Sequence, residues 1–345
     1  MAALAASLTK SRWSGILLPV SWVYGSVARR RRARLAANQV KLPVPVISVG
    51  NITCGGTGKT PVVEMLARDL LARGRRPAIL SRGYRRGDDG LNDEARVLAD
   101  NLPGVPQFLA PDRIGSGRSA IAAGADVLVL DDGFQYARLA RDLEIVLIDA
   151  LDPFGGGRVL PAGLLREPLG ALRGAGLLGI TRGDLAPPLA RGILEGLLRE
   201  RCPGVPRIGI RAEPVAWEPV GEKNGPGLGP RAHAGRTVMG FAGLGNPDAF
   251  RLQLLGLGVR LADWLPFPDH HRYRPADLAE IRRRAEAVKA QAVLTTQKDA
   301  VKLPPPGAGA PWQFLRIACR PDPDPSPLEA ALERTLAGSR AEVHR

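Results

Sequence analysis

The chain has 345 residues, 45% of them apolar and 24% charged, which is enough for two domains or one large one with a sizeable core. This composition excludes a polytopic membrane protein, and the recurring apolar segments exclude a disordered chain. The 48 Lys and Arg residues outnumber the 34 Asp and Glu residues, so the net charge is +14, which indicates either an anionic partner or a GC-rich genome. The 3 cysteines are far apart, which argues against a disulfide framework and favours a reducing compartment.

The first apolar segment, residues 13–27, is followed by arginines at 29–32 and 34. As a helix it would rise about 22 Å, short of a hydrocarbon core of roughly 30 Å, and Pro19 interrupts it. Apolar residues with Trp and Tyr beside a basic cluster are typical of a helix that lies in an anionic membrane surface. We therefore expect residues 1–40 to form a membrane-associated segment; a core helix, a signal peptide and a true span remain alternatives.

Short β-branched runs alternate with helical patterns through the next part of the chain, which predicts a parallel sheet covered on both faces. Strands are expected at 44–50, 78–80, 125–130, 143–148 and 176–180, and helices at 61–72, 93–100 and 114–123. A Pro- and Gly-rich stretch at 213–235, with the turn signal Asn224-Gly225, predicts a hairpin-like linker. A second α/β unit follows, with strands at 237–240 and 292–296 and helices at 247–256 and 275–290.

A glycine-rich loop joins the first predicted strand to the first predicted helix of this sheet. Its sequence, GNITCGGTGKT at 50–60, matches the phosphate-binding pattern G-x-x-x-x-G-K-[ST], except that Thr53 stands at the first glycine. The glycines let backbone N–H groups approach phosphate oxygens, Lys59 can reach the β- and γ-phosphates, and the Thr60 hydroxyl can bind Mg²⁺. The residues predicted to bind ATP are Thr53, Cys54, Gly55, Gly56, Thr57, Gly58, Lys59 and Thr60.

A pair of carboxylates, Asp131 and Asp132, ends an apolar predicted strand. P-loop proteins place an acidic metal-binding residue there, and strand side chains alternate in direction, so one carboxylate is expected to face the metal. With Thr60, the pair predicts a Mg²⁺ site, and which of the two binds the metal stays open. The predicted fold is α/β: a P-loop NTPase-like parallel sheet at 41–212, a smaller α/β lobe at 236–345 and an N-terminal membrane-interface helix.

Several motifs accompany the phosphate loop, in a fixed order along residues 11–304: VPVISVGNITCGGTGKTPVVEMLA, LSRGYRR, NDEA, LDDGFQYARLARDLEIVLIDA, LPAGLLREP, GFAGLGNP, PFPDHHRY and TTQKDAVKLP. In order and spacing they resemble the tetraacyldisaccharide 4′-kinases of lipid A biosynthesis. The resemblance implies two α/β lobes and transfer of the γ-phosphate of ATP to the 4′-hydroxyl of an acylated glucosamine disaccharide 1-phosphate. It also implies that the protein is located at the cytoplasmic face of a bacterial inner membrane, either as a peripheral protein or anchored through its N-terminal segment.

The resemblance further implies a catalytic base. In the family pattern an Asp in a G-D-E-P motif, coupled to a His in a D-H motif, accepts the proton of the sugar hydroxyl; Asp93 and His270 match these positions. This chain lacks the flanking Gly and Pro, since residues 92–95 read NDEA, and it has Gln297 where relatives usually have Glu. The residue types alone leave Asp93 as a helix cap and His270 as a buried turn residue as alternatives.

Further candidates lie at strand ends and in one loop. Arg82 and Tyr84 can contact phosphate or substrate, or merely cap the sheet; Arg166 can bind the 1-phosphate or the reacting phosphate, and Glu167 can assist the metal, or the two can form a surface ion pair. Lys298 and Asp299 are candidates for contact with nucleotide, and His271 is expected to be a flanking residue.

The phosphate loop by itself is compatible with two other functions, namely another P-loop metabolic enzyme or a membrane-associated nucleotide switch. A nucleic-acid-dependent ATPase would place cations and stacking aromatic residues along a groove. Aromatic residues are only 5% of this chain, and its arginine run follows an apolar segment, so no nucleic-acid partner is expected. The sequence predicts no particular oligomeric state.

Overall fold

The structure is a computed structural model that describes residues 17–84, 90–222 and 227–342. Its chain divides into two units, each with its own internal contacts. The larger unit comprises Met1–Arg85, Asn101–Arg211 and Cys319–Arg345, and the smaller unit comprises Arg86–Asp100 and Ala212–Ala318.

The larger unit contains a parallel sheet with strand order β3-β2-β4-β1-β5-β6-β7. The bounds are β1 (Val46–Asn51), β2 (Pro77–Ser81), β3 (Gln107–Leu109), β4 (Val127–Asp131), β5 (Leu143–Asp149), β6 (Leu177–Thr181) and β7 (Arg207–Pro219). Because the strands are parallel, the carboxyl ends of β1, β4, β5 and β6 meet at one edge of the sheet, where open α/β sheets bind their ligands. The five strands expected from the sequence in this part of the chain are confirmed, whereas β3 and β7 were not predicted.

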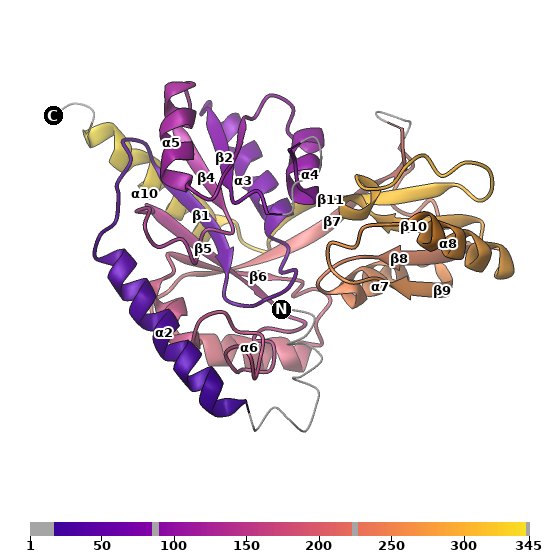
Figure 1. The fold of residues 1–345 in the computed structure, drawn as a ribbon, viewed down its shortest axis with the longest axis horizontal. Helices are drawn as coiled ribbons and strands as arrows, with labels where there is room; N and C mark the ends of the chain where they lie inside the picture. The colour runs from indigo at the N-terminus through magenta and orange to yellow at the C-terminus, as the bar shows by residue number, and fades with distance from the viewer. Residues whose placement is uncertain (1–16, 85–89, 223–226, 343–345) are drawn as a thin grey trace. The chain divides into compact units, whose positions relative to one another are not determined.

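Helices cover both faces of this sheet, as expected (Figure 1). Ile114 and Ala120 of α5 pack against Leu80 and Leu128 on one face, and Leu194 of α6 belongs to a separate cluster on the other. The helices are α2 (Leu18–Ala36), α3 (Lys59–Ala72), α5 (Arg113–Ala122), the 3₁₀ helix η2 (Leu169–Gly174), α6 (Pro188–Arg201) and α10 (Ser326–Glu342). The predicted α/β class is confirmed.

The smaller unit is a second α/β layer with strand order β7-β11-β10-β8-β9. Its further strands are β8 (Thr237–Ala242), β9 (Arg260–Pro266), β10 (Ala292–Thr296) and β11 (Trp312–Asp322), and its helices are α7 (Pro247–Gly256), α8 (Pro275–Ala287) and α9 (Gln297–Ala300). Phe250 of α7 and Ile281 of α8 lie in different apolar clusters, so these helices cover opposite faces. The helix α4 (Asp93–Asn101) contributes all but its last residue to this unit.

The predicted linker at 213–235 is wrong at its start, because residues 213–219 continue β7. Trp217 is fully buried and exchanges two backbone hydrogen bonds of 2.8 Å with Leu228, so the chain does return on itself there. Burial of the indole outweighs the local turn preference of the prolines and glycines. Asn224-Gly225 lies outside the described residues. The predicted C-terminal lobe at 236–345 also ends too late, because α10 packs on β5 and β6 of the larger unit.

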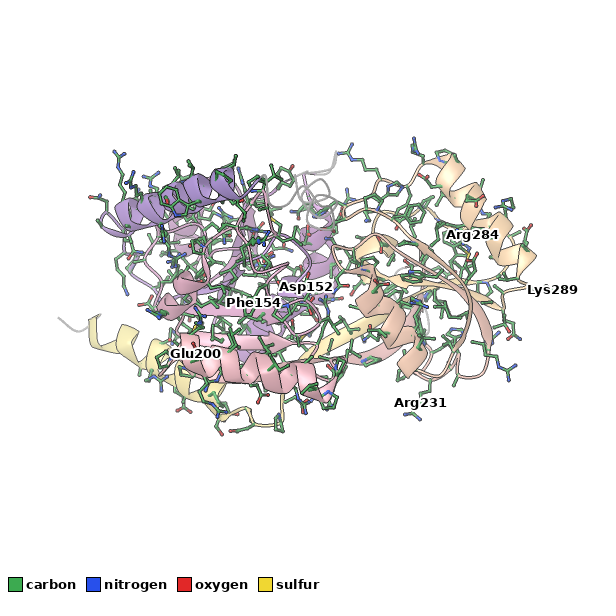
Figure 2. All side chains as sticks on the ribbon, turned by 90° about the horizontal axis from the view of Figure 1, so that it is seen from below. Asp152, Phe154, Glu200, Arg231, Arg284 and Lys289 are labelled. Carbon is green, nitrogen blue, oxygen red and sulfur yellow. The ribbon has the colours of Figure 1, made fainter. Side chains whose placement is uncertain are left out.

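The helix α2 begins with Pro19 in its first turn and continues through the arginines to Ala36, so the proline starts the helix rather than interrupting it. Its buried residues are small: the Ser21 hydroxyl accepts a hydrogen bond from the Ala162 N–H (2.9 Å), and Gly25 abuts Val159. Several of its apolar side chains are exposed, and Trp22 is the most exposed of them at 73%. Figure 2 shows that many side chains of this helix project outward. Among the described residues, no helix has the length and apolar character that crossing a bilayer requires.

Candidate active site

The phosphate loop follows β1 and leads into α3, as the sequence predicts. Gly55 (φ 141°) and Gly58 (φ 81°) adopt positive φ, which side chains rarely tolerate, and Gly58 stands at the N-cap of α3. Nothing lies within 4 Å of the position that a Cβ at Gly55 would take. The loop therefore leaves open space beside its backbone, at a helix N-terminus suited to an anion.

The departure at Thr53 has a structural reason. Thr53 is buried and pairs with Leu165, while the Asn51 amide donates to the Thr53 carbonyl oxygen (3.0 Å) and hydroxyl oxygen (3.3 Å). The Cys54 N–H donates to the Leu164 carbonyl (2.7 Å), and the Arg166 N–H donates to the Ile52 carbonyl (2.7 Å). At Thr53, where the pattern has its first glycine, the loop is therefore fixed by hydrogen bonds to the segment that carries Arg166.

Three predicted site residues from distant parts of the sequence meet beside this loop. Arg166 Nη1 donates to both carboxylate oxygens of Asp132 (3.1 and 3.0 Å), and Lys59 Nζ lies 3.5 Å from Asp132 Oδ1. Burial alone would raise the pKa of Asp132, but the two cations hold it well below its usual range. Asp132 is therefore ionised, and it keeps Lys59 and Arg166 close to the loop.

The residues predicted to bind Mg²⁺ have suitable chemistry. Thr60 lies in the first turn of α3, Asp131 ends β4 and is buried, and Asp132 follows it. These residues offer a hydroxyl and two carboxylates, and oxygen ligands of this kind are the ones that Mg²⁺ prefers. In the described part of the chain, no group of three or more His, Cys, Asp and Glu side chains could enclose a metal by itself. The set fits an ion held by few protein ligands together with nucleotide phosphates.

Side chains that the sequence analysis missed support the loop from the neighbouring strand ends. Arg182, after β6, donates to the Gly56 carbonyl (2.9 Å) and pairs with the buried Asp149, and the Thr181 hydroxyl donates to the Thr57 carbonyl (3.1 Å). Gln135 links the other side. Its amide donates to the Asn51 carbonyl (2.8 Å), and its Oε1 accepts from Arg166 (3.1 Å). These groups follow strands, and only the parallel topology shows that they converge.

The other predicted residues of the larger unit have different surroundings. Arg82 and Tyr84 are exposed after β2. Arg113, which the sequence analysis missed, is buried with its guanidinium 4.9 Å from the centre of the Tyr136 ring, and burial lowers its pKa although Asp132 opposes the shift. Glu167, a candidate for assisting the metal, accepts hydrogen bonds at its carboxylate from Arg32 of α2 (3.0 and 3.1 Å).

A second cluster of predicted residues lies in the smaller unit, around the start of α4. The Asn92 side chain accepts the Ala95 N–H (2.9 Å), so Asn92 caps the helix and the alternative role of Asp93 as the cap is wrong. This leaves the Asp93 carboxylate for His270, whose Nδ1 lies 3.2 Å from Asp93 Oδ2. His270 has φ 58°, a conformation that a non-glycine residue rarely adopts and that marks functional sites more often than chance.

Charged groups surround this Asp–His pair. Lys302 Nζ lies 3.7 Å from Asp93, and His270 Nε2 lies 3.6 Å from Glu94. Lys298 bridges Glu94 (2.9 Å) and Asp269 (3.1 Å). Burial alone would raise the pKa of Asp93, but the His270 hydrogen bond and Lys302 lower it below its usual value. The carboxylate is therefore ionised around neutral pH and able to accept a proton.

Two neighbouring residues are structural. Asp299 is fully buried and accepts hydrogen bonds from the Gly243 N–H (3.0 Å), the Tyr273 hydroxyl (2.9 Å) and Lys302 (2.9 Å), so it fixes the Lys302 side chain. His271 stacks on Phe267 with its Nε2 3.1 Å from Asp277, as expected of a flanking residue.

Comparisons with known proteins agree with the α/β fold described above. Residues 13–337 match the model of the LpxK family, tetraacyldisaccharide-1-P 4′-kinase. The chain belongs to this family. It is 43% identical to the tetraacyldisaccharide 4′-kinase of Anaeromyxobacter sp. (strain Fw109-5) over 79% of this chain and 77% of the relative, and 41% identical to that of Syntrophus aciditrophicus (strain SB) over 87% and 86%. A solved structure of LpxK from Aquifex aeolicus in complex with ATP is 31% identical, with a TM-score of 0.72 over 94% of this chain and 99% of that one.

Membership of the family confirms the function that the motif series predicts. The protein is a kinase of lipid A biosynthesis that uses ATP with Mg²⁺. The two alternatives, a different P-loop metabolic enzyme and a non-catalytic nucleotide switch, are thereby excluded.

Proposed function

We propose that the two clusters share one phosphoryl transfer to the 4′-hydroxyl of an acylated glucosamine disaccharide 1-phosphate. In the loop cluster of Lys59, Asp132 and Arg166, the two cations bind the ATP phosphates and Asp132 holds both cations at the loop. Asp93 with His270 accepts the proton of the attacking hydroxyl. The observation that carries the proposal is the Asp93–His270 contact of 3.2 Å, with helix capping left to Asn92. An ionised carboxylate beside an imidazole is a proton acceptor.

On the phosphate side, the transfer needs positioning and charge neutralisation more than covalent chemistry. The N–H groups of residues 55–60, at the start of α3, face the β- and γ-phosphates, and Lys59 neutralises charge that develops on the transferred group. Asp132 holds Arg166 at the loop. At this position the guanidinium can bind the reacting phosphate, whereas the 1-phosphate lies at the other end of the disaccharide. On the acceptor side, Asp93 takes the proton, and His270 shares the resulting change of charge.

Thr60, Asp131 and Asp132 would hold Mg²⁺, which when bound neutralises phosphate charge. Replacing Asp131 or Asp132 by Asn should raise the Mg²⁺ concentration for half-maximal transfer by at least about tenfold, because each change removes a charged oxygen ligand. Asp69→Asn, which disrupts a surface pair with Arg73 (2.8 Å), is the matched control. A magnesium titration of the initial rate measures the effect. An unchanged Mg²⁺ requirement in both variants would contradict the assignment of these carboxylates.

The acceptor is proposed to be an anionic lipid held in a bilayer, which fits the exposed features of α2. Exposed Trp22 and Val23 lie on the same helix as four exposed arginines. Apolar side chains can enter the interface while the arginines attract anionic headgroups. We propose that the enzyme attaches through α2 to the cytoplasmic face of the inner membrane, and that exposed Arg82 and Tyr84 contact the lipid substrate.

The double variant Trp22→Ala/Val23→Ala should bind vesicles of phosphatidylglycerol and phosphatidylethanolamine at least about tenfold more weakly, since the removed apolar surface no longer enters the interface. Co-sedimentation measures the partition coefficient. The matched control, Leu252→Ala/Leu255→Ala, removes exposed apolar side chains from α7 and should leave binding unchanged. Equal vesicle binding by the α2 variant and the wild type would rule out this attachment.

A further inference from the structure

Arg32 differs from its neighbours in the basic cluster of α2. Arg29, Arg30, Arg31 and Arg34 are exposed, whereas the Arg32 side chain is 22% exposed and turns toward the protein. Its Nη1 donates to both carboxylate oxygens of Glu167 (3.1 and 3.0 Å) and to the Phe134 carbonyl (3.0 Å). A membrane-facing cluster explains the exposed arginines, but it gives no reason for this inward contact.

The two segments that Arg32 joins both carry groups of the phosphate site. Phe134 lies between Asp132 and Gln135, and Glu167 directly follows Arg166, which pairs with Asp132 and Gln135. One guanidinium therefore holds both backbone segments that bring the Asp132–Arg166 ion pair together. Glu167 is almost fully buried, and burial raises its pKa although Arg32 opposes the shift.

The segment after Asp132 needs an external constraint. Asp132 has φ 52°, which is unfavourable for a residue with a side chain. The Arg32 guanidinium lies 4.0 Å from the centre of the Phe134 ring, and Phe134 packs so tightly on Gly50 that a Cβ there would lie 2.5 Å from the Phe134 Cβ. Phe134 is thus packed between Arg32 and the end of β1, where the phosphate loop begins.

Arg141 supports the same turn from the other side. It donates to the carbonyls of Gly133 (3.4 Å) and Tyr136 (3.3 Å) and pairs with the buried Glu144 (3.0 Å). Arg141 thus holds carbonyls before and after the one bound by Arg32, whereas Arg32 also binds Glu167, next to Arg166.

We propose that Arg32 is a positioning residue for phosphoryl transfer, which holds the Asp132 and Arg166 segments together and so fixes their ion pair at the phosphate loop. The inference rests on the roles proposed above for Asp132 and Arg166. It also connects α2, the helix with the exposed apolar side chains, directly to the phosphate site.

The test measures transfer from ATP to the lipid acceptor in detergent micelles, together with the melting temperature of each variant. Arg32→Ala should lower kcat about a hundredfold at a temperature where it remains folded, because a displacement of about 1 Å in a positioned group has an effect of that size. Arg32→Lys keeps the charge but not the planar fork, and should retain an intermediate kcat. Both variants should keep the wild-type KM for the lipid.

A double variant separates positioning from stability. Arg32→Ala leaves the Glu167 carboxylate buried without its partner, which lowers the melting temperature; adding Glu167→Gln removes that charge and should restore the melting temperature. The proposal predicts that kcat stays low in Arg32→Ala/Glu167→Gln, because the Phe134 carbonyl is still released. Recovery of kcat together with the melting temperature would show a merely structural role and overturn the proposal, as would a wild-type kcat in Arg32→Ala.

A matched control exists in the smaller unit, where Arg283 and Glu280 form an exposed pair through two hydrogen bonds (2.8 and 2.7 Å). Arg283→Ala should leave kcat unchanged. Arg166→Ala and Asp132→Asn are measured in the same assay. Full activity in both would refute the proposed function of the loop cluster, whereas loss in both with full activity in Arg32→Ala would refute only the inference about Arg32.

Discussion

Replacing Asp93 by Asn should lower kcat for transfer by a factor of about 10² to 10⁴ while leaving ATP affinity unchanged. The amide keeps the size and shape of the carboxylate but cannot take the proton of the 4′-hydroxyl. The His270 contact at 3.2 Å and Lys302 at 3.7 Å lower the pKa of Asp93, so the wild-type group is ready to accept. Initial rates with labelled ATP and the lipid acceptor measure the loss.

A matched Asp–His pair lies beside this one. Asp277 Oδ2 lies 3.1 Å from His271 Nε2 and also accepts the Arg274 N–H (2.8 Å) at the start of α8. Asp277→Asn therefore removes a similar contact from the same unit, and it should lower stability while kcat remains at the wild-type level. A large loss of kcat in Asp277→Asn, or a small loss in Asp93→Asn, would contradict the assignment of Asp93 as the base. The changes in kcat would then report on the folding of the unit.

The pH dependence of the reaction tests the partner of the base. Asp93 acts in its ionised form, so activity falls as the pH drops through its pKa, which His270 and Lys302 hold below the usual value despite burial. In His270→Asn the hydrogen bond from the imidazole is lost, so burial raises the pKa of Asp93 above its wild-type value. The acid limb of the kcat profile should therefore move to higher pH. An unmoved limb would exclude coupling between the two side chains.

Replacing Lys59 by Ala should lower kcat/KM for ATP by a factor of about 10² to 10³, the size expected when one preorganised charged donor is lost. Lys59 begins α3, its Nζ lies 3.3 Å from Asn51 Oδ1 and 3.5 Å from Asp132, and the glycines beside it leave the loop open for phosphate. The change removes a cation from the phosphates and also from Asp132. Isothermal titration with ATP, alongside the rate assay, measures both consequences.

Two further variants serve as controls for Lys59→Ala. Lys59→Arg keeps the charge but places a planar guanidinium where a compact ammonium fits, so it should not restore the rate. Lys41→Ala removes a lysine whose partner is Asp142 on the surface of the same unit, and it should behave as the wild type. Wild-type ATP affinity in Lys59→Ala would show that the loop binds nucleotide without its lysine.

The local parts of the site could be predicted from the sequence. The strand, glycine loop and helix at 46–72 have a continuous signal, since the β-branched run, the glycines and the lysine follow one another in the chain. Asp131 and Asp132 could be placed because they end an apolar strand. Arg182 and Gln135 could not, because neither has a local motif and their contacts to the loop depend on which strands are neighbours in the sheet.

The errors have physical causes. β7 was missed because its second half contains Pro214 and Pro219 and continues into a Pro- and Gly-rich stretch. Its pairing with distant parts of the chain supplies the stability that local propensity lacks. The contact between Glu167 and Arg32 could not be predicted, since composition cannot show that one arginine of a basic cluster turns inward. A signal was present for Lys302, which follows Lys298 by four residues and lies just beyond the end of α9.

One experiment compares ATP binding with phosphate transfer in the wild type, Asp93→Asn and Lys59→Ala. ATP affinity is measured by titration, and transfer is measured from γ-labelled ATP to tetraacyldisaccharide 1-phosphate in micelles. If the clusters divide the work as proposed, the wild type labels the lipid at the 4′ position, Asp93→Asn binds ATP normally without labelling it, and Lys59→Ala loses both. Near-normal labelling by Asp93→Asn, or loss of ATP affinity in that variant, would contradict the account.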